Sequence, residues 1–217
     1  MKSIFKLLAV LILLPYAFGG QNVTIKHKVY TTTFSKSKRF PVVVKWWLTK
    51  QMLDCRKKMK RTDDFGPDPL LPAYTNLDTD YMHGGFDRGH NCDAADNLCD
   101  TVAEHQSFYF SNMCAQTKEL NRGIWEHLES YCRALADSLD STLIWCGSVA
   151  NKSAKKIGPD SVVVPDYCWK IIYVRKLKKT LAYVFPNSTS LTGDFPNYAV
   201  KVDSVEKLTG LKFTRKK

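Results

Sequence analysis

Three residues whose side chains can perform acid–base and metal chemistry lie within forty positions of one another. Residues 86–91 read Phe-Asp-Arg-Gly-His-Asn, which places His90 in a short charged segment, and Asn121 and Glu129 follow it. An imidazole titrates near neutrality, so His90 is a candidate general base. The amide oxygen of Asn121 suits a hard cation such as Mg²⁺, which keeps most of its water shell. Glu129 is then expected to bind water molecules of that cation.

Each of these residues taken alone has a plainer explanation. A single histidine is more often structural than catalytic, an asparagine ahead of a helix commonly caps it, and Arg88 beside Asp87 suggests a surface ion pair. Together they match the needs of phosphodiester cleavage, namely a base that activates water, a cation that neutralises charge at phosphorus and a basic surface that binds the polymer. On a continuous helix Asn121 and Glu129 would lie about 80° apart and border one groove.

Further residues extend this pattern over most of the chain, from about Tyr30 to about Asn187. They are Arg61, Phe65, Asp68 and Pro69; Asp80, Tyr81, Gly85 and residues 86–90; Phe108, Ser111, Asn112 and Gln116; residues 120–129, which read Leu-Asn-Arg-Gly-Ile-Trp-Glu-His-Leu-Glu; and Val164, Pro165, Trp169 and Lys170. In this combination the sequence resembles the DNA/RNA non-specific endonucleases, which are sugar-non-specific, endonuclease G-like ββα-metal nucleases. One departure is Ala115, where the family usually has proline, with Cys114 ahead of it.

The resemblance implies an α+β fold with a ββα-metal, or His-Me, finger and a central, largely antiparallel sheet flanked by helices. It implies an endonuclease that hydrolyses DNA and RNA with little sequence specificity and leaves 5′-phosphate and 3′-hydroxyl ends. By the same resemblance His90 is the general base and Asn121 the sole direct protein ligand of a hydrated Mg²⁺, for which Mn²⁺ would substitute. Glu129 binds that metal through water.

The resemblance also assigns roles to three arginines. It implies that Arg61 and Arg133 stabilise the charge of the phosphate, and that Arg88 positions the finger or contacts phosphate. The partners implied are DNA and RNA, bound through their phosphate backbones. A homodimer and a protein inhibitor both stay open.

The elements that must position these residues are indicated by hydrophobic periodicity. Alternating β-branched and aromatic residues predict strands, and apolar residues at helical spacing predict helices. Strands before and after a helical block are typical of α+β folds. We expect strands over residues 23–34, 42–49, 143–146, 161–164, 169–174 and 181–185, and helices over residues 104–110 and 124–139. At strand and helix spacing, Trp46, Trp47 and Trp125 are expected in the core rather than stacked on bases.

Composition excludes fibrous and wholly disordered classes, since 44% of the 217 residues are hydrophobic and 24% are charged. The first twenty residues have two lysines, an apolar run and small residues before Gly19 and Gly20, which is the order of a secretory signal. We expect cleavage near Gly19 or Gly20, secretion or export to a periplasm, no membrane span, and one domain over residues 21–217. The formal charge of +11 becomes +9 without that segment, which favours polyanionic partners.

Export would expose the cysteines to an oxidising environment, which favours disulfides. The seven are Cys55, Cys92, Cys99, Cys114, Cys132, Cys146 and Cys168. Sequence does not fix their pairing, although the short separation of Cys92 and Cys99 favours a bond between them, and an odd count leaves one thiol over.

Two alternatives belong to other classes of protein. One is a secreted, non-catalytic nucleic-acid-binding protein, which the positive charge supports equally but which has no use for the combination of His90, Asn121 and Glu129. The other is a zinc protein, whose ligands would come from His83, His90, Cys92, Cys99, His105 and Cys114. Their spacing fits no closed cysteine and histidine pattern.

Overall fold

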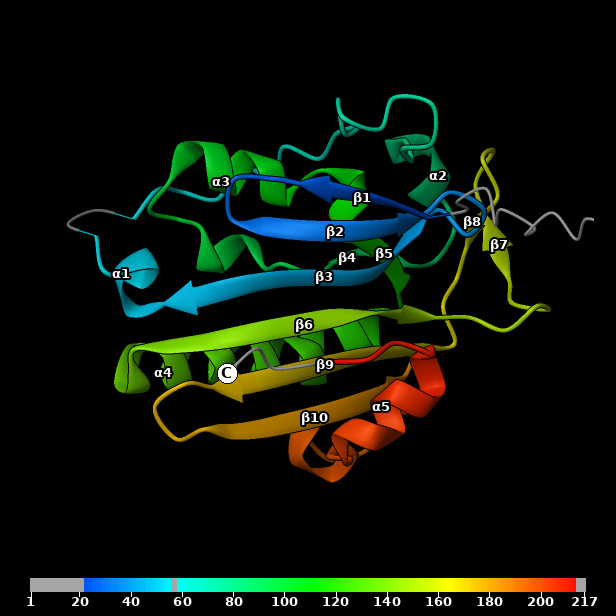
Figure 1. The fold of residues 1–217 in the computed structure, drawn as a ribbon. Coiled ribbons are helices and arrows are strands. Elements are labelled where there is room, and N and C mark those ends of the chain that lie inside the picture. The colour runs from blue at the N-terminus through cyan, green and yellow to red at the C-terminus, as the bar shows by residue number, and fades with distance from the viewer. Residues whose placement is uncertain (1–21, 56–57, 214–217) are drawn as a thin grey trace, which may run out of the picture.

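The computed structural model describes residues 22–55 and 58–213, and its main element is a six-stranded sheet in the order β1-β2-β3-β6-β9-β10 (Figure 1). Every neighbouring pair in this sheet is antiparallel. The strands are β1 (Asn22–Lys26), β2 (Tyr30–Ser35), β3 (Phe40–Thr49), β6 (Ser141–Val149), β9 (Tyr167–Val174) and β10 (Lys179–Pro186). This architecture confirms the expected α+β class with its antiparallel sheet.

The two faces of the sheet differ in what covers them. Along β3 the side chains of Val44, Trp46 and Leu48 are buried, whereas those of Lys45 and Trp47 between them are exposed. Successive side chains of a strand point to opposite faces, so the buried set marks the face that packs on the core. On that face α4 (Glu126–Leu139) lies behind the sheet (Figure 1). The opposite face is covered beside β10 by α5 (Val202–Thr209), which buries Val205.

A second, two-stranded sheet lies on the α4 side. Its strands β4 (Asp87–His90) and β5 (Met113–Gln116) are antiparallel, and a wide helical turn, η3 (Leu120–Trp125), leads from β5 into α4. These elements form the expected ββα unit. The remaining elements are α1 (Lys50–Leu53), α2 (Asp78–Tyr81), α3 (Thr101–Ser107) and the pair β7 (Lys156–Ile157) and β8 (Val162–Val163), with short 3₁₀ turns between them.

Several boundaries differ from the sequence prediction for local reasons. Residues 23–34 form a hairpin rather than one strand, because a turn closed by the His27 amide and the Tyr30 carbonyl (2.8 Å) separates β1 from β2. The helix expected over 104–110 begins earlier, because Asp100 caps it by accepting bonds from the amides of Val102 and Ala103. The four-residue strands β4 and β5 were too short to show periodicity.

The predicted bond between Cys92 and Cys99 is wrong. Cys99 pairs with Cys55, and the other five cysteines are free thiols buried in the protein. Cys92 is fully buried in the core, away from any partner that would make it a disulfide staple. The predicted signal segment, residues 1–20, lies outside the described residues.

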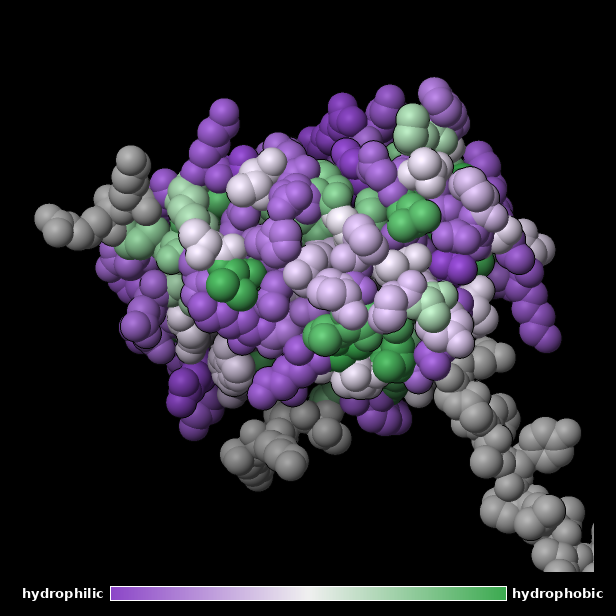
Figure 2. Space-filling model, turned by 90° about the horizontal axis from the view of Figure 1, so that it is seen from above, coloured by the Kyte–Doolittle hydropathy of each residue, from purple (hydrophilic) through white to green (hydrophobic). Residues whose placement is uncertain are grey.

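The surface seen from above is mostly hydrophilic, with hydrophobic residues in small separate groups (Figure 2). Among the described residues, no helix is long and apolar enough to cross a bilayer.

Candidate active site

The finger brings His90 to the end of β4, opposite Met113 of β5. Close packing between the two strands requires glycine at position 89. A Cβ built on Gly89 would lie 2.0 Å from Oε1 of Gln116, so any larger residue displaces that side chain. Behind the strands, Asn112 binds only main-chain groups: its amide nitrogen donates to the carbonyls of Cys92 (2.8 Å) and Ser107 (2.7 Å), and its amide oxygen accepts from the Cys92 amide (2.9 Å).

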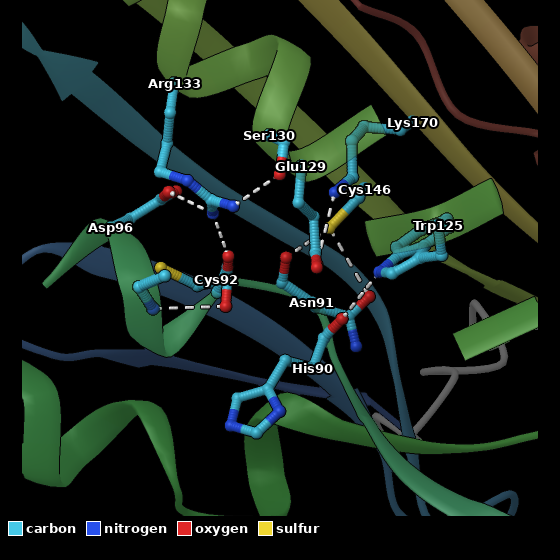
Figure 3. Close-up of polar contacts among 12 residues, drawn as sticks. His90, Asn91, Cys92, Asp96, Trp125, Glu129, Ser130, Arg133, Cys146 and Lys170 are labelled. Atoms are coloured by element: carbon cyan, nitrogen blue, oxygen red, sulfur yellow. Dashed lines mark hydrogen bonds and ion pairs between the residues drawn. The ribbon is translucent and has the colours of Figure 1, made fainter. Parts of the chain in front are cut away.

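The ring of His90 lies in an aromatic setting without a hydrogen-bond partner. Phe65 and Phe108 contact it edge-on, with ring centroids 5.5 and 5.0 Å away, and its Nε2 has no partner within the protein. Its carbonyl accepts from Nε1 of Trp125 (3.2 Å), while the ring extends to the other side (Figure 3). Burial, followed by the positive charge of Arg61, lowers the pKa of His90 to about 3. The imidazole is therefore neutral at neutral pH and able to accept a proton.

Asn121 is oriented by the first residue of β4. Its amide nitrogen donates to Oδ2 of Asp87 (3.0 Å), and Arg122 donates to both oxygens of the same carboxylate (2.7 and 2.8 Å). Burial raises the pKa of Asp87, but the bonds from Arg122 and Asn121 outweigh it and leave the pKa below its usual value. With its nitrogen fixed in this way, the amide of Asn121 keeps its oxygen for another partner.

The helix that carries Asn121 and Glu129 is not continuous, contrary to the sequence argument. Residues Leu120–Trp125 form a π-helical turn, and Gly123 has a non-helical backbone (φ −123°, ψ −106°) before α4 begins. Wide turns of this kind are frequent at functional sites. The 80° separation expected on one straight α-helix therefore does not apply, yet both side chains still line the same cleft.

Glu129 and Lys170 form a buried pair beside the cleft. Nζ of Lys170 lies 3.6 Å from Oε1 of Glu129 and 4.2 Å from the centre of the Trp125 ring (Figure 3). Burial raises the pKa of Glu129 to about 8, with a further contribution from Asp93 and an opposing one from Lys170. Burial opposes the charge of Lys170, but Glu129 outweighs it and raises the pKa of the ammonium group. Oε1 of Glu129 has no hydrogen bond in the protein, so it is left free to accept one.

Each of the three predicted arginines is paired with a carboxylate. Arg61 binds Asp63 (2.6 Å), Arg88 binds Asp78, and Arg133 binds Asp93. The ion pair between Arg88 and Asp87 that the sequence suggests is not formed, because Arg122 takes Asp87. The guanidinium of Arg88 instead lies 3.8 Å from the centre of the Phe65 ring.

All six predicted residues line one cleft of about 610 Å³. They are His90, Asn121, Glu129, Arg61, Arg88 and Arg133. The structure thus places them together, and their chemical roles stay predictions. Sequence reasoning missed the orienting part of Asp87 and of Lys170, although both belong to the motifs, because the partner of each lies far away in the chain. It also missed Asp93, which no motif includes.

The donor atoms facing the cleft suit a hydrated hard cation better than zinc. An amide oxygen on Asn121 and an unpartnered carboxylate oxygen on Glu129 match Mg²⁺, which prefers oxygen and retains water. The described residues contain no group of three or more histidine, cysteine, aspartate or glutamate side chains suited to a metal. Cys99 is held in a disulfide, so it supplies no thiolate to the zinc alternative.

The fold and the cleft define a ββα-finger protein with a basic, oxygen-lined site, and comparisons with known proteins agree. A family model described as DNA/RNA non-specific endonuclease matches residues 11–217. The chain therefore belongs to the DNA/RNA non-specific endonuclease family.

Individual relatives fit this assignment. A protein of Nostoc named "Nuclease" is 33% identical over 212 residues, covering 92% of this chain and 76% of the relative. "Nuclease EXOG, mitochondrial" of Xenopus laevis is 34% identical over 69% of this chain, which spans only 46% of that relative's length. A solved structure titled "Crystal structure of the EndoG/EndoGI complex: Mechanism of EndoG inhibition" superposes with a TM-score of 0.81 at 27% identity, covering 90% of this chain and 87% of that one.

Proposed function

We propose that this chain is a divalent-cation-dependent endonuclease that hydrolyses phosphodiester bonds in DNA and RNA with little sequence specificity. The observation that carries the proposal is the neutral, unpartnered ring of His90 in one cleft with the oxygens of Asn121 and Glu129. Neither simple phosphate binding nor a structural role needs that combination. Mg²⁺ is the cation that the donors suit, and Mn²⁺ is expected to substitute.

The side chains of the cleft divide the reaction among them. Nε2 of His90 accepts a proton from a water molecule as its oxygen attacks phosphorus. Arg61 and Arg88 offer positive charge to the phosphate oxygens, and their carboxylate partners keep the guanidinium groups in place. The bond from phosphorus to the 3′ oxygen breaks, which leaves 5′-phosphate and 3′-hydroxyl ends. A cation held by Asn121, with its waters on Glu129, would neutralise negative charge on the phosphate.

Binding of the polymer is expected to depend on charge rather than base identity. Each phosphate neutralised by lysine or arginine gives a slope of about −0.9 in log K against log salt on duplex DNA. Affinity should therefore fall steeply with salt. The neighbour's title describes inhibition of EndoG, and a protein inhibitor that covers the same cleft is part of this proposal for the present chain.

We further propose export of the chain through cleavage of residues 1–20, which leaves residues 21–217 as one domain. The charged, apolar and small-residue order of the first twenty residues supports this, and the disulfide of Cys55 and Cys99 suits an oxidising compartment. Intact mass of the protein recovered from the culture medium or periplasm tests it. Recovery of the uncleaved chain from the cytoplasm alone would contradict it.

Cleavage of closed circular DNA and of RNA by the purified protein tests the main proposal. His90→Ala should lower the rate by about 10²–10⁴-fold, the loss typical of a general base. His127→Ala is the matched control, because His127 is exposed and pairs with Asp194 outside the cleft. EDTA should stop the reaction reversibly, and Mg²⁺ should restore it.

Three outcomes would contradict the proposal. A His90→Ala variant within threefold of the wild type would remove that residue from the mechanism. Full activity in EDTA would remove the cation. A protein that binds both polymers without cleaving either would be the non-catalytic alternative.

A further inference from the structure

The sheet face opposite the cleft is exposed over its first three strands. Residues Lys26, Thr31 and Lys45 lie in register on β1, β2 and β3, and both lysines are exposed. Helix α5 covers only the far side of this face, beside β10 (Figure 1). A broad strip of open sheet surface is thus accessible to a partner.

The charge of this face has one sign. None of the six strands contains an aspartate or a glutamate. The turn from β9 to β10 reads Arg175-Lys176-Leu177-Lys178, and all four of its residues are exposed, as is Lys179 after them. A surface with several exposed cations and no carboxylate on its strands attracts a polyanion.

An exposed indole lies within this basic surface. Trp47 is 40% exposed, and the guanidinium of Arg175 lies 5.8 Å from the centre of its ring. The expectation that Trp47 belongs to the core is therefore wrong, whereas Trp46 and Trp125 are buried as expected. Nucleic-acid-binding proteins bind single strands with this combination, in which cations follow the backbone and aromatic rings stack on bases.

The surface is separate from the cleft, because neighbouring residues of β3 point to opposite sides. Trp46 points to the α4 side, where its Nε1 donates to Asp96 (3.1 Å), and Asp96 in turn contacts Arg133 of the cleft. Trp47 points the other way. A strand bound over Trp47 therefore does not occupy the cleft.

We propose that this face, formed by Lys26, Lys45, Trp47, Arg175 and the basic β9–β10 turn, is a second binding site for single-stranded DNA or RNA. The inference rests on the proposed function, since it gives a long polymer two contacts on one enzyme. Trp47 stacks on a base, and the lysines and Arg175 bind flanking phosphates. Retention of the polymer between cleavage events follows from the second contact.

Fluorescence anisotropy of labelled oligothymidylate of twenty nucleotides, in EDTA to prevent cleavage, measures this binding directly. Trp47→Ala should weaken binding about tenfold, as expected for loss of one stacked base. Lys45→Gln combined with Lys178→Gln should weaken it and flatten its salt dependence. Lys152→Gln combined with Lys207→Gln is the matched control, because it removes two exposed lysines elsewhere and should leave the affinity within twofold. Trp47→Thr, a residue suited to an exposed strand, replaces Trp47→Ala if the latter fails to fold.

Cleavage of a six-nucleotide substrate separates this site from the catalytic proposal, since so short a strand need not reach both faces. Trp47→Ala should leave that rate unchanged. Unaltered oligothymidylate affinity in both Trp47 variants, with normal cleavage, overturns the second site alone. Loss of cleavage in the wild type, with Trp47-dependent binding retained, overturns only the catalytic proposal.

Two further outcomes would overturn the assignment to nucleic acid. Heparin should lose affinity with the lysine variants but not with Trp47→Ala, because it has no base to stack; an equal loss in Trp47→Ala would show that the indole does not stack on bases. Sedimentation should give the same mass for Trp47→Ala and the wild type. A wild-type dimer that the variant abolishes would assign this face to a second copy of the chain.

Discussion

The orientation of the Asn121 amide depends on a residue thirty-four positions earlier in the chain. Only the nitrogen of an amide donates, so the carboxylate of Asp87 selects the rotamer in which this nitrogen faces β4. The oxygen of Asn121 then faces away from Asp87. Asp87 is thus a positioning residue, and its bidentate pair with Arg122 holds its own carboxylate in place.

Removal of this acceptor should weaken cation binding without removing the ligand. Asp87→Ala is expected to raise the Mg²⁺ concentration for half-maximal activity about 10–100-fold, as is usual when a group that orients a ligand is lost. Asn121→Ala should be more severe, so that added Mg²⁺ restores only part of the rate. Mg²⁺ titrations of the cleavage rate check both, with Asp160→Ala as the control because Asp160 pairs with Arg39 away from the cleft. Wild-type Mg²⁺ dependence in Asp87→Ala would show that the amide is held by other means.

Lys170 acts on Glu129 through charge. In the metal-free protein the ammonium group opposes the rise in the Glu129 pKa that burial causes. Lys170→Met should therefore raise that pKa further above about 8, so that the carboxylate ionises only at still higher pH. Titration of ¹³C-labelled glutamate carboxyl groups by NMR measures the shift. An unchanged Glu129 titration in Lys170→Met would contradict the coupling.

At the scale of elements, the sequence predicts which side chains meet better than how they are held. His90, Asn121 and Glu129 share a cleft as their spacing implied, because β4, η3 and α4 follow one another closely in the finger. The π-helical turn at Gly123 could not be predicted, since its sequence is compatible with an ordinary helix and packing selects the wider turn. Ion pairs such as Arg133 with Asp93 were also hidden, because their members lie forty positions apart.

The loop before α2 is fixed to the sheet by one buried carboxylate. Asp68 lies 3.1 Å from Nε2 of His27, and it accepts from the hydroxyl of Ser111 and from the amide of Leu70. Burial raises its pKa, but these partners outweigh burial and leave the pKa below its usual value. This loop also carries Arg61 and Phe65, so the carboxylate positions part of the cleft wall.

Acid should weaken this attachment in a defined direction. A carboxyl group whose pKa is lowered by folding stabilises the native state above its unfolded pKa of about 3.9 and loses that contribution as the pH falls through the folded pKa. The wild type should therefore lose stability below about pH 4 more steeply than Asp68→Asn. Urea unfolding at a series of pH values measures both slopes. Parallel slopes for the two proteins would show that Asp68 carries no such linkage.

At the scale of the whole molecule, the disulfide of Cys55 and Cys99 spans 44 positions and encloses the loop that carries Arg61 and the entire β4 strand. Its pairing could not be predicted, because separation along the chain says little about which cysteines fold close together. The five free thiols are buried among apolar side chains and behave as small hydrophobic residues.

Loss of this disulfide should destabilise the protein without removing a cleft residue. Cys55→Ser combined with Cys99→Ser is expected to lower the free energy of unfolding by roughly 2–4 kcal/mol, since a long loop of the unfolded chain is no longer closed. Urea unfolding of the variant checks this, and the wild type treated with a reductant should match it. Equal stability of the oxidised and double-variant proteins would mean that the bond adds nothing to the fold.

Asn112 is a position at which mutational tolerance would mislead. It touches no residue of the cleft by hydrogen bond, yet its amide uses both ends on the main chain of Cys92 and Ser107. Aspartate presents an acceptor where two carbonyls require a donor, and leucine satisfies none of the three groups. A saturation library selected for nuclease activity should therefore score Asn112 as intolerant as His90. Only a parallel selection for abundance would distinguish them, because Asn112 variants would disappear from the folded pool whereas His90 variants would remain in it.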